Sequence, residues 1–288
     1  MVKSKMIVGI VAALAVVGIF VGNSIATSKA EDAMAELKLQ ASVFGAKVEY
    51  EDVSANIFGT VELEDVSVTL NRDTLDIETV SLSGLAENVD DISDITLMLE
   101  GLSAKGMSKS SIDKTPDSPI ELVIYSAVMN GNELDAMLDI SIDQDKNELA
   151  INELTIEGQD MGDISLSTTI YLDSPIKQGI NIHSNLNITN FAVTAQDSGL
   201  ADLFFEIEAE RKNTDADELK DKFFAKAEKG VSRAKGVEKE FMEAALDLID
   251  GDRVTMERET DEKVSMDFNR LRRYGITSIL KEAKITFS

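Results

Sequence analysis

Apolar and polar residues alternate at every second position over much of the chain, and this period restricts the fold more than any other feature. The pattern starts at Val48 and Tyr50 and continues through residues 61–70. Because successive side chains of a strand point to opposite faces of a sheet, this period predicts half-buried antiparallel strands. Further strands are predicted at residues 75–85, 92–102, 122–129, 134–142, 149–156, 164–172, 180–193, 254–268 and 285–287. Strands about 8 to 12 residues apart, without helices between them, favour a mainly β fold, either a curled antiparallel sheet or a sandwich.

Turn-forming residues separate these strands. We predict a hairpin around Phe58-Gly59 and a second one at Asn130-Gly131, a dipeptide that is a strong hairpin signal. Another turn is predicted at residues 143–147, where five polar residues interrupt the alternation.

A spacing of three to four residues marks residues 215–250 as helical. Asp215 and Glu218 form a start that resembles a capping box, and a glycine follows residue 250 as a fitting end. One face collects the apolar residues Leu219, Phe223, Ala227, Val231, Ala234, Phe241, Ala245 and Leu248. Gly230 and Gly236 leave open whether this is one bent helix or two helices. We predict that this long amphipathic helix packs on an apolar face of the sheet.

An apolar run near the N-terminus predicts a membrane anchor. Residues 6–22 contain no charged side chain, and residues 23–26 extend the run to about 20 residues, enough to cross a hydrocarbon core about 30 Å thick. Lys3 and Lys5 precede it, so the positive-inside rule places the N-terminus in the cytoplasm. The other interpretation is a signal peptide that is cleaved after Ser24-Ile25-Ala26, a small-x-small site.

These signals divide the chain into six parts. They are a cytoplasmic tip (1–5), a transmembrane anchor (6–26), a helical stalk (27–46), a β-rich extracytoplasmic domain (47–212), an amphipathic helix (213–251) and C-terminal strands that complete the domain (252–288). The sequence therefore predicts a single-pass inner-membrane protein whose C-terminal domain lies in the periplasm.

The residue inventory argues against most catalytic chemistry. The chain has 28 basic and 53 acidic residues, a formal net charge of −25, no Cys and one His. Such a charge repels nucleic acid, and the missing thiols remove cysteine nucleophiles, thiolate metal sites and disulfides. We therefore predict no enzyme activity, no catalytic residue, no cofactor and no nucleic-acid partner.

One segment resembles the opening of a calcium loop but departs from it further on. Asp143, Asp145 and Asn147 have the alternate spacing of EF-hand ligands, yet the glycine that the loop requires is missing and Leu154 stands at the twelfth position. We interpret the segment as a hairpin turn and predict no metal site. His183 alternates with apolar neighbours, so we expect it to face solvent on a strand.

Basic residues gather in the predicted helix and again near the C-terminus. They are Lys220, Lys222, Lys226, Lys229, Arg233, Lys235, Lys239, Arg270, Arg272 and Arg273. They can form a solvated helix face with i,i+4 ion pairs, or a patch for anionic lipid headgroups or an acidic partner surface. The candidate interaction residues are Phe223, Phe241, Lys226 and Arg233. We expect both phenylalanines to be buried against the sheet; the alternative is that their face binds a lipid surface or a partner.

The strand patterns resemble the start of AsmA-like and YdgA-like proteobacterial envelope proteins. The resemblance rests on the order of anchor, stalk and strands, on residues 48–68 (VEYEDVSANIFGTVELEDVSV) and on residues 148–162 (ELAINELTIEGQDMG). It implies a long curled sheet with a hydrophobic groove, and a part in lipid movement or outer-membrane assembly. AsmA-like relatives are generally longer than this chain.

Two functions remain open from the sequence. The first is a non-enzymatic, membrane-anchored envelope protein that scaffolds or modulates a larger assembly, with the inner membrane and envelope proteins as partners. The second is a lipid-handling module whose β groove shields acyl chains. A closed core with a patterned outer surface would favour the first function, and an apolar groove would favour the second.

Overall fold

The computed structural model describes residues 38, 42, 46–56, 60–70, 73–84, 93–103, 119–171, 186–258, 264–266 and 284–288. The chain divides into two compact units: unit 1 is Met1–Ser141 with Ile156–Gln159, and unit 2 is Ile142–Thr155 with Asp160–Ser288. The chain as a whole is mainly β with antiparallel strand pairs, as the sequence predicts, and three helices in unit 2 accompany the strands there. The predicted tip and anchor lie outside the described residues, as does the stalk except for residues 38, 42 and 46.

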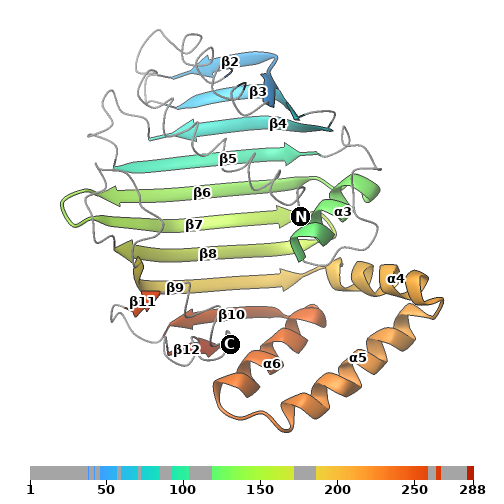
Figure 1. Cartoon of the computed structure of the whole chain (residues 1–288). Coiled ribbons are helices and arrows are strands. Elements are labelled where there is room, and N and C mark those ends of the chain that lie inside the picture. Colours follow the sequence, from blue (N-terminus) through green and yellow to red (C-terminus); the bar gives the residue numbers. More distant parts are fainter. Residues whose placement is uncertain are drawn as a thin grey trace. The chain divides into compact units, whose positions relative to one another are not determined.

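The strands of unit 1 follow one another in an antiparallel sheet (Figure 1). They are β1 (Ala46–Glu49), β2 (Asp52–Ala55), β3 (Val61–Leu70), β4 (Asp73–Ser83), β5 (Asp94–Leu102) and β6 (Leu134–Asp143), the last of which ends in unit 2. The order is β1-β3-β4-β5-β6, and β2 pairs with β3 beyond the end of β1. The β2–β3 pair confirms the first predicted hairpin, since Asn56 donates its backbone N–H to the carbonyl of Thr60 at 3.0 Å.

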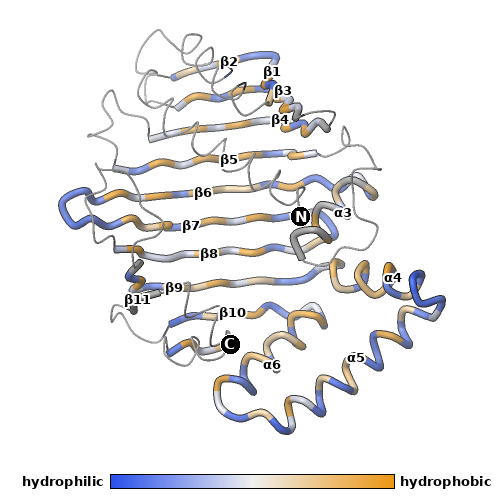
Figure 2. Tube along the Cα trace, in the orientation of Figure 1, coloured by the Kyte–Doolittle hydropathy of each residue, from blue (hydrophilic) through white to orange (hydrophobic). Residues whose placement is uncertain are grey.

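The apolar face of the unit 1 sheet forms a closed core. Leu75 and Ile77 of β4 are 1% and 0% exposed, and Val66 of β3 lies opposite Ile77. The other buried strand residues are Val48, Val61, Leu63, Val68, Val80, Leu82, Ile95, Leu97, Leu99 and Leu102. Figure 2 shows the alternation of hydrophobic and hydrophilic residues along β3, β4 and β5. This alternation puts the aliphatic side chains on one face, where their burial is the main stabilising term.

The alternation slips by one residue in each of these three strands, and the slips line up across the sheet. Asp65 in β3 has a φ of 51°, Gly101 in β5 has a φ of 64°, and Glu78 of β4 falls opposite Asp65 in the register. A Cβ on residue 101 would lie 2.5 Å from Cγ of Glu78, so glycine is the residue that fits there. Because the slips match across β3, β4 and β5, the apolar residues on both sides of each slip stay on the same face.

The opposite face of β3, β4 and β5 is acidic. These strands contain eight carboxylates and no basic residue. The exposed carboxylates are Glu64, Asp65, Asp76, Glu78, Asp94 and Glu100. A sheet with one closed and one charged face has its polar side available to solvent or to a partner.

The strand predicted at residues 122–129 is wrong, because these residues lie in helix α3 (Pro119–Asn130). Proline suits the first turn of a helix, where a backbone N–H has no partner within the helix. Gly131 follows the helix with a φ of 75°, a left-handed conformation typical of the residue after a helix. The Asn130-Gly131 pair therefore ends a helix and is not the turn of a hairpin.

Unit 2 contains a smaller antiparallel sheet and three consecutive helices. Its strands are β8 (Gly162–Tyr171), β9 (Leu186–Asp197), β10 (Arg253–Arg258), β11 (Val264–Met266) and β12 (Ile285–Phe287), and β7 (Glu148–Gly158) has residues in both units. Within unit 2 the order is β8-β9-β10-β12, with β11 paired to β9. The helices are α4 (Leu200–Lys212), α5 (Ala216–Val231) and α6 (Val237–Ile249).

The single long helix predicted over residues 215–250 is two helices. α5 ends at Val231, and α6 starts after Gly236, which has a φ of 58°. The start is as predicted, since Asp215 accepts a hydrogen bond from the backbone N–H of Glu218 at 3.1 Å. The prediction of β structure up to residue 212 is also wrong in part, because it missed α4.

The apolar face of the unit 2 sheet is only partly covered. α6 packs on β9, β10 and β12, whereas α5 contacts α4 and α6. Ile285 of β12 is the buried centre of this packing. On β8, by contrast, Ile164 is 44% exposed, although it lies opposite Ala195 of β9 and therefore on the apolar face of the sheet. Unit 2 therefore confirms that a helix packs on the sheet, and among the described residues of the predicted long helix the α6 part makes this contact.

Candidate interaction surface on the helical arm

All four candidate interaction residues lie in the helical arm, by which we mean residues 200–249, which contain α4, α5, α6 and the turns between them. In Figure 1, α4 continues from the end of β9. The next helix, α5, turns back from the end of α4 and lies apart from the strands, and α6 then packs on β10 and β12. The arm is thus fixed to the sheet at both ends, and α5 connects the two. No residue of α5 is buried.

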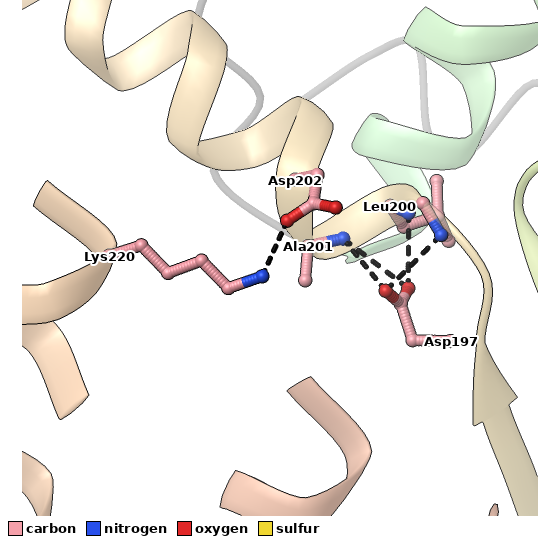
Figure 3. A network of polar contacts seen from close by, with 6 residues as sticks. Asp197, Leu200, Ala201, Asp202 and Lys220 are labelled. Atoms are coloured by element: carbon pink, nitrogen blue, oxygen red, sulfur yellow. Dashed lines mark hydrogen bonds and ion pairs between the residues drawn. The ribbon is translucent and has the colours of Figure 1, made fainter. Parts of the chain in front are cut away.

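Asp197 fixes the start of the arm. Its carboxylate accepts hydrogen bonds from the backbone N–H groups of Gly199, Leu200 and Ala201, at distances of 3.1 to 3.3 Å (Figure 3). These are donors that a helix start leaves without partners within the helix. Burial raises the pKa of Asp197, while the same backbone hydrogen bonds oppose the rise. The carboxylate of Asp197 therefore caps the start of α4, which is a structural role.

A salt bridge joins α4 to α5. Lys220 points toward Asp202, and its Nζ lies 2.6 Å from Oδ1 of that residue (Figure 3). The hydrogen bond from this lysine to Asp202 raises the pKa of Lys220. The corner between the helices is closed by Asn213, whose left-handed backbone lets its N–H bond back to α4. A polar hollow of about 410 Å³ at this corner is lined by Glu206, Ala209, Glu210, Asn213, Thr214 and Ala216.

Four phenylalanines form a continuous edge-to-face row across α4 and α5. The ring centroids of Phe204 and Phe205 are 5.6 Å apart, those of Phe205 and Phe223 are 5.6 Å apart, and those of Phe223 and Phe224 are 6.0 Å apart. Phe205 is buried, but Phe223 remains 40% exposed. This edge-to-face geometry is favourable for aromatic pairs. Phe223 therefore rests on α4 and keeps one edge in solvent, and the prediction that it is buried against the sheet is wrong.

Phe241 lies on α6 and faces the sheet. Its ring centroid is 5.8 Å from that of Phe287 in β12, and both residues pack against buried Ile285. The side chain is partly buried, so the expected packing on the sheet is found for this phenylalanine. At the junction of α5 and α6, Cε of Met242 occupies the space beside Gly230, where a Cβ would lie only 2.7 Å from it.

Phe223 and Lys226 lie on one side of α5, and Arg233 lies in the turn just after the helix ends at Val231. Arg233 is seven residues after Lys226, and its backbone N–H still bonds to the carbonyl of Gly230, so it follows Lys226 at the end of the same side of the helix. Both are exposed. Phe241 lies on a different helix, so the structure brings three of the four candidate residues together and separates the fourth.

Other predicted features are settled only in part. The predicted turn is found at residues 144–147, between β6 and β7, and Nζ of Lys146 lies 2.7 Å from Oδ2 of Asp143 beside it. His183 and the basic residues at 270, 272 and 273 lie outside the described residues. Across the described ranges, no group of three His, Cys, Asp or Glu side chains is arranged to hold a metal ion.

The sequence analysis missed the residues that position the arm. Asp197, followed by a helix with Asp202 in its first turn and Arg211 and Lys212 in its last, has the charge distribution that suits a helix dipole. That signal was present in the sequence. Nothing in the sequence alone, however, indicates that Lys220 reaches Asp202 or that Phe223 packs on Phe205.

Comparison of the chain with protein-family models, with curated proteins and with solved structures gave no match. None of the helices that the structure describes has both the length and the apolar character needed to cross a membrane. The run at residues 6–26 lies outside the residues to which that statement applies.

Proposed function

We propose that the protein is a non-enzymatic, single-pass inner-membrane protein whose periplasmic domain scaffolds or modulates an envelope assembly. The anchor is supported by the uncharged run at residues 6–22 and by Lys3 and Lys5 before it. In this proposal the N-terminus is cytoplasmic, and both described units lie in the periplasm.

The closed core of unit 1 is the observation that carries the scaffold role. Leu75 and Ile77 are almost fully buried, so these apolar side chains at the centre of the sheet are not accessible to a ligand. The opposite side presents exposed carboxylates on three adjacent strands that contain no basic residue. A face of one charge can select a partner of the opposite charge and speed its association. We therefore assign the acidic face of β3–β5 to a basic surface on a partner protein.

The non-enzymatic part is supported by the role of Asp197, a partly buried carboxylate whose pKa is raised by burial. A catalytic carboxyl needs an oxygen within reach of a substrate. Both carboxylate oxygens of Asp197 already accept hydrogen bonds from three backbone N–H groups at the start of α4. Its shifted pKa therefore has a structural explanation.

A second candidate is a lipid-handling module, because the apolar face of unit 2 is partly open. Ile164 on β8 is 44% exposed beside the part of the sheet that α6 covers. Exposed aliphatic side chains on a sheet are suited to contact with acyl chains. The curled, grooved sheet implied by the AsmA-like resemblance belongs to this second proposal.

Purification of the full-length protein from membranes in mild detergent separates the two candidates, because both bound protein and bound lipid can be read. We expect a protein partner that is lost when Glu64, Glu78 and Glu100 are changed to Gln. The matched control changes Glu206, Glu210 and Glu228 to Gln, since these exposed carboxylates lie on the arm. Stoichiometric lipid without a protein partner would support the second candidate and contradict the first.

The topology needs its own test. A reporter fused after Ser288 should be active only outside the cytoplasm, and the full-length protein should stay in the membrane pellet after a carbonate wash. Release of a species that begins at Thr27 would show a cleaved signal peptide and contradict the anchor.

A further inference from the structure

We propose that α5 lies against the anionic headgroups of the membrane that holds the anchor, with Lys226, Lys229 and Arg233 on the headgroups and Phe223 at the edge of the contact. The inference rests on the proposed membrane attachment and adds a second, electrostatic contact to it.

The first observation is a stripe of cations that runs along one face of α5 and ends in the turn that follows it. Lys222, Lys226, Lys229 and Arg233 follow one another at intervals of four, three and four residues, which is the spacing of a single helix face. We call these four residues the basic stripe. All four are exposed.

The second observation is that most of the stripe has no acidic partner. Lys222 binds Glu218 at 2.5 Å. In contrast, no carboxylate among the described residues lies within salt-bridge distance of Lys226, Lys229 or Arg233. Cations without partners keep their full charge available to an outside surface.

The local charge is opposite to that of the whole chain. From Lys222 to Lys235 the sequence has five basic residues and one acidic residue, Glu228, whereas the complete chain carries −25. A basic segment that persists in such an acidic protein is complementary to an anionic surface. The membrane is such a surface, and the proposed anchor at residues 6–26 keeps the chain tethered to it.

The third observation places an aromatic side chain beside the stripe. Phe223 precedes Lys226 by one helical turn and is 40% exposed, while its other side packs on Phe205. Helices that lie in a membrane interface combine a basic polar face with exposed Phe, Trp or Leu. α5 has this combination, and its contacts with α4 and α6 leave the stripe uncovered.

The absence of tryptophan from the chain permits a direct test. Full-length protein with Phe223→Trp is reconstituted into vesicles of phosphatidylcholine alone, or of phosphatidylcholine mixed with phosphatidylglycerol. We expect a blue shift of the emission, and quenching by brominated lipid, only in the anionic vesicles. Added salt should reverse both effects, because it screens exposed charges. Phe241→Trp is the matched control, since its ring packs on β12, and it should give the same emission in both vesicles.

Charge-reversed variants identify the residues responsible. Lys226→Glu with Arg233→Glu should abolish the shift of Trp fluorescence, whereas Lys239→Glu should retain it because Lys239 pairs with Glu243 on α6. Amine labelling of the unsubstituted protein gives a readout that leaves Phe223 in place. Labelling of Lys226 and Lys229 should fall in anionic vesicles, and labelling of Lys239 should not.

The possible failures are distinguishable. Protein that floats with the vesicles and resists carbonate, but shows no shift and no change in labelling, overturns the contact of α5 and leaves the anchor standing. Protein that floats with neither vesicle overturns both. A shift that appears equally in neutral vesicles and grows with the protein-to-lipid ratio would assign the stripe to a second copy of the chain and overturn the lipid contact.

Discussion

The two units have the same kind of strand and opposite kinds of packing. In unit 1, Ile77 of β4 is 0% exposed; in unit 2, Ile164 of β8 is 44% exposed, although both lie on the apolar side of an antiparallel sheet. Alternation at period two decides which side a residue faces, but it does not decide whether anything covers that side. Unit 1 therefore has the buried area of a stable core, and unit 2 has the open surface expected of an interaction region.

The largest difference is expected from one isoleucine in each unit. Ile77→Ala leaves a cavity in a packed core and should lower the free energy of unfolding by about 3 to 5 kcal/mol. Ile164→Ala removes a side chain that is already half in water, and should cost less than about 1 kcal/mol. Urea denaturation of both full-length variants in mild detergent, followed by circular dichroism, measures the two costs. Equal costs would mean that the units do not differ in packing.

A pair of phenylalanines makes the same comparison within the helical arm. Phe241→Ala removes the contacts with Ile285 and Phe287 that hold α6 on the sheet, and should cost about 2 to 3 kcal/mol because the ring is only partly buried. Phe223→Ala should cost about 1 kcal/mol, since the ring packs on one side only. Thermal unfolding of each variant tests the order. A larger loss for Phe223→Ala would indicate that α5 belongs to a core.

The smallest expected effects concern two aspartates whose pKa values move in opposite directions. Hydrogen bonds from the hydroxyls of Ser93 and Ser141 lower the pKa of Asp94 in unit 1, and burial raises the pKa of Asp197 in unit 2. NMR titration of the carboxyl carbons should place Asp94 below and Asp197 above the ordinary value of 3.8.

The two shifts have opposite consequences for stability. The contribution of Asp94 is present above its unfolded pKa and is lost as the pH falls through its folded pKa. The contribution of Asp197 is present below its unfolded pKa and is lost as the pH rises through its folded pKa. Asp94→Asn and Asp197→Asn should each remove the matching pH dependence. Shifts in the same direction at both sites would contradict the burial of Asp197.

Much of the fold could be predicted because the strands have a strong local signal. The alternation of Val61, Leu63, Val66 and Val68 predicts β3, although it slips by one residue between Leu63 and Val66. The start of α5 was equally readable, because an N-cap aspartate acts within a single turn of helix.

Helices that are rich in strand-forming residues could not be predicted in the same way. The apolar run in α3 contains Ile120, Val123 and Ile124, which favour strands by propensity, and tertiary context overrides that preference. Only part of the candidate interaction surface could be predicted from the sequence. Spacing along one helix places Phe223 with Lys226 and Arg233, but the separation of Phe241 depends on the break at Gly236 and on packing between distant residues.

Native-state hydrogen exchange of the full-length protein tests the contrast between the units most directly. If unit 1 holds the stable core and α5 is held only at its ends, amides of β4 should exchange only through global unfolding. Amides of α5 should exchange faster by on the order of 100-fold or more, through local opening. Equal protection of β4 and α5 would contradict the account, because it would place α5 in the same cooperative core as the buried strands.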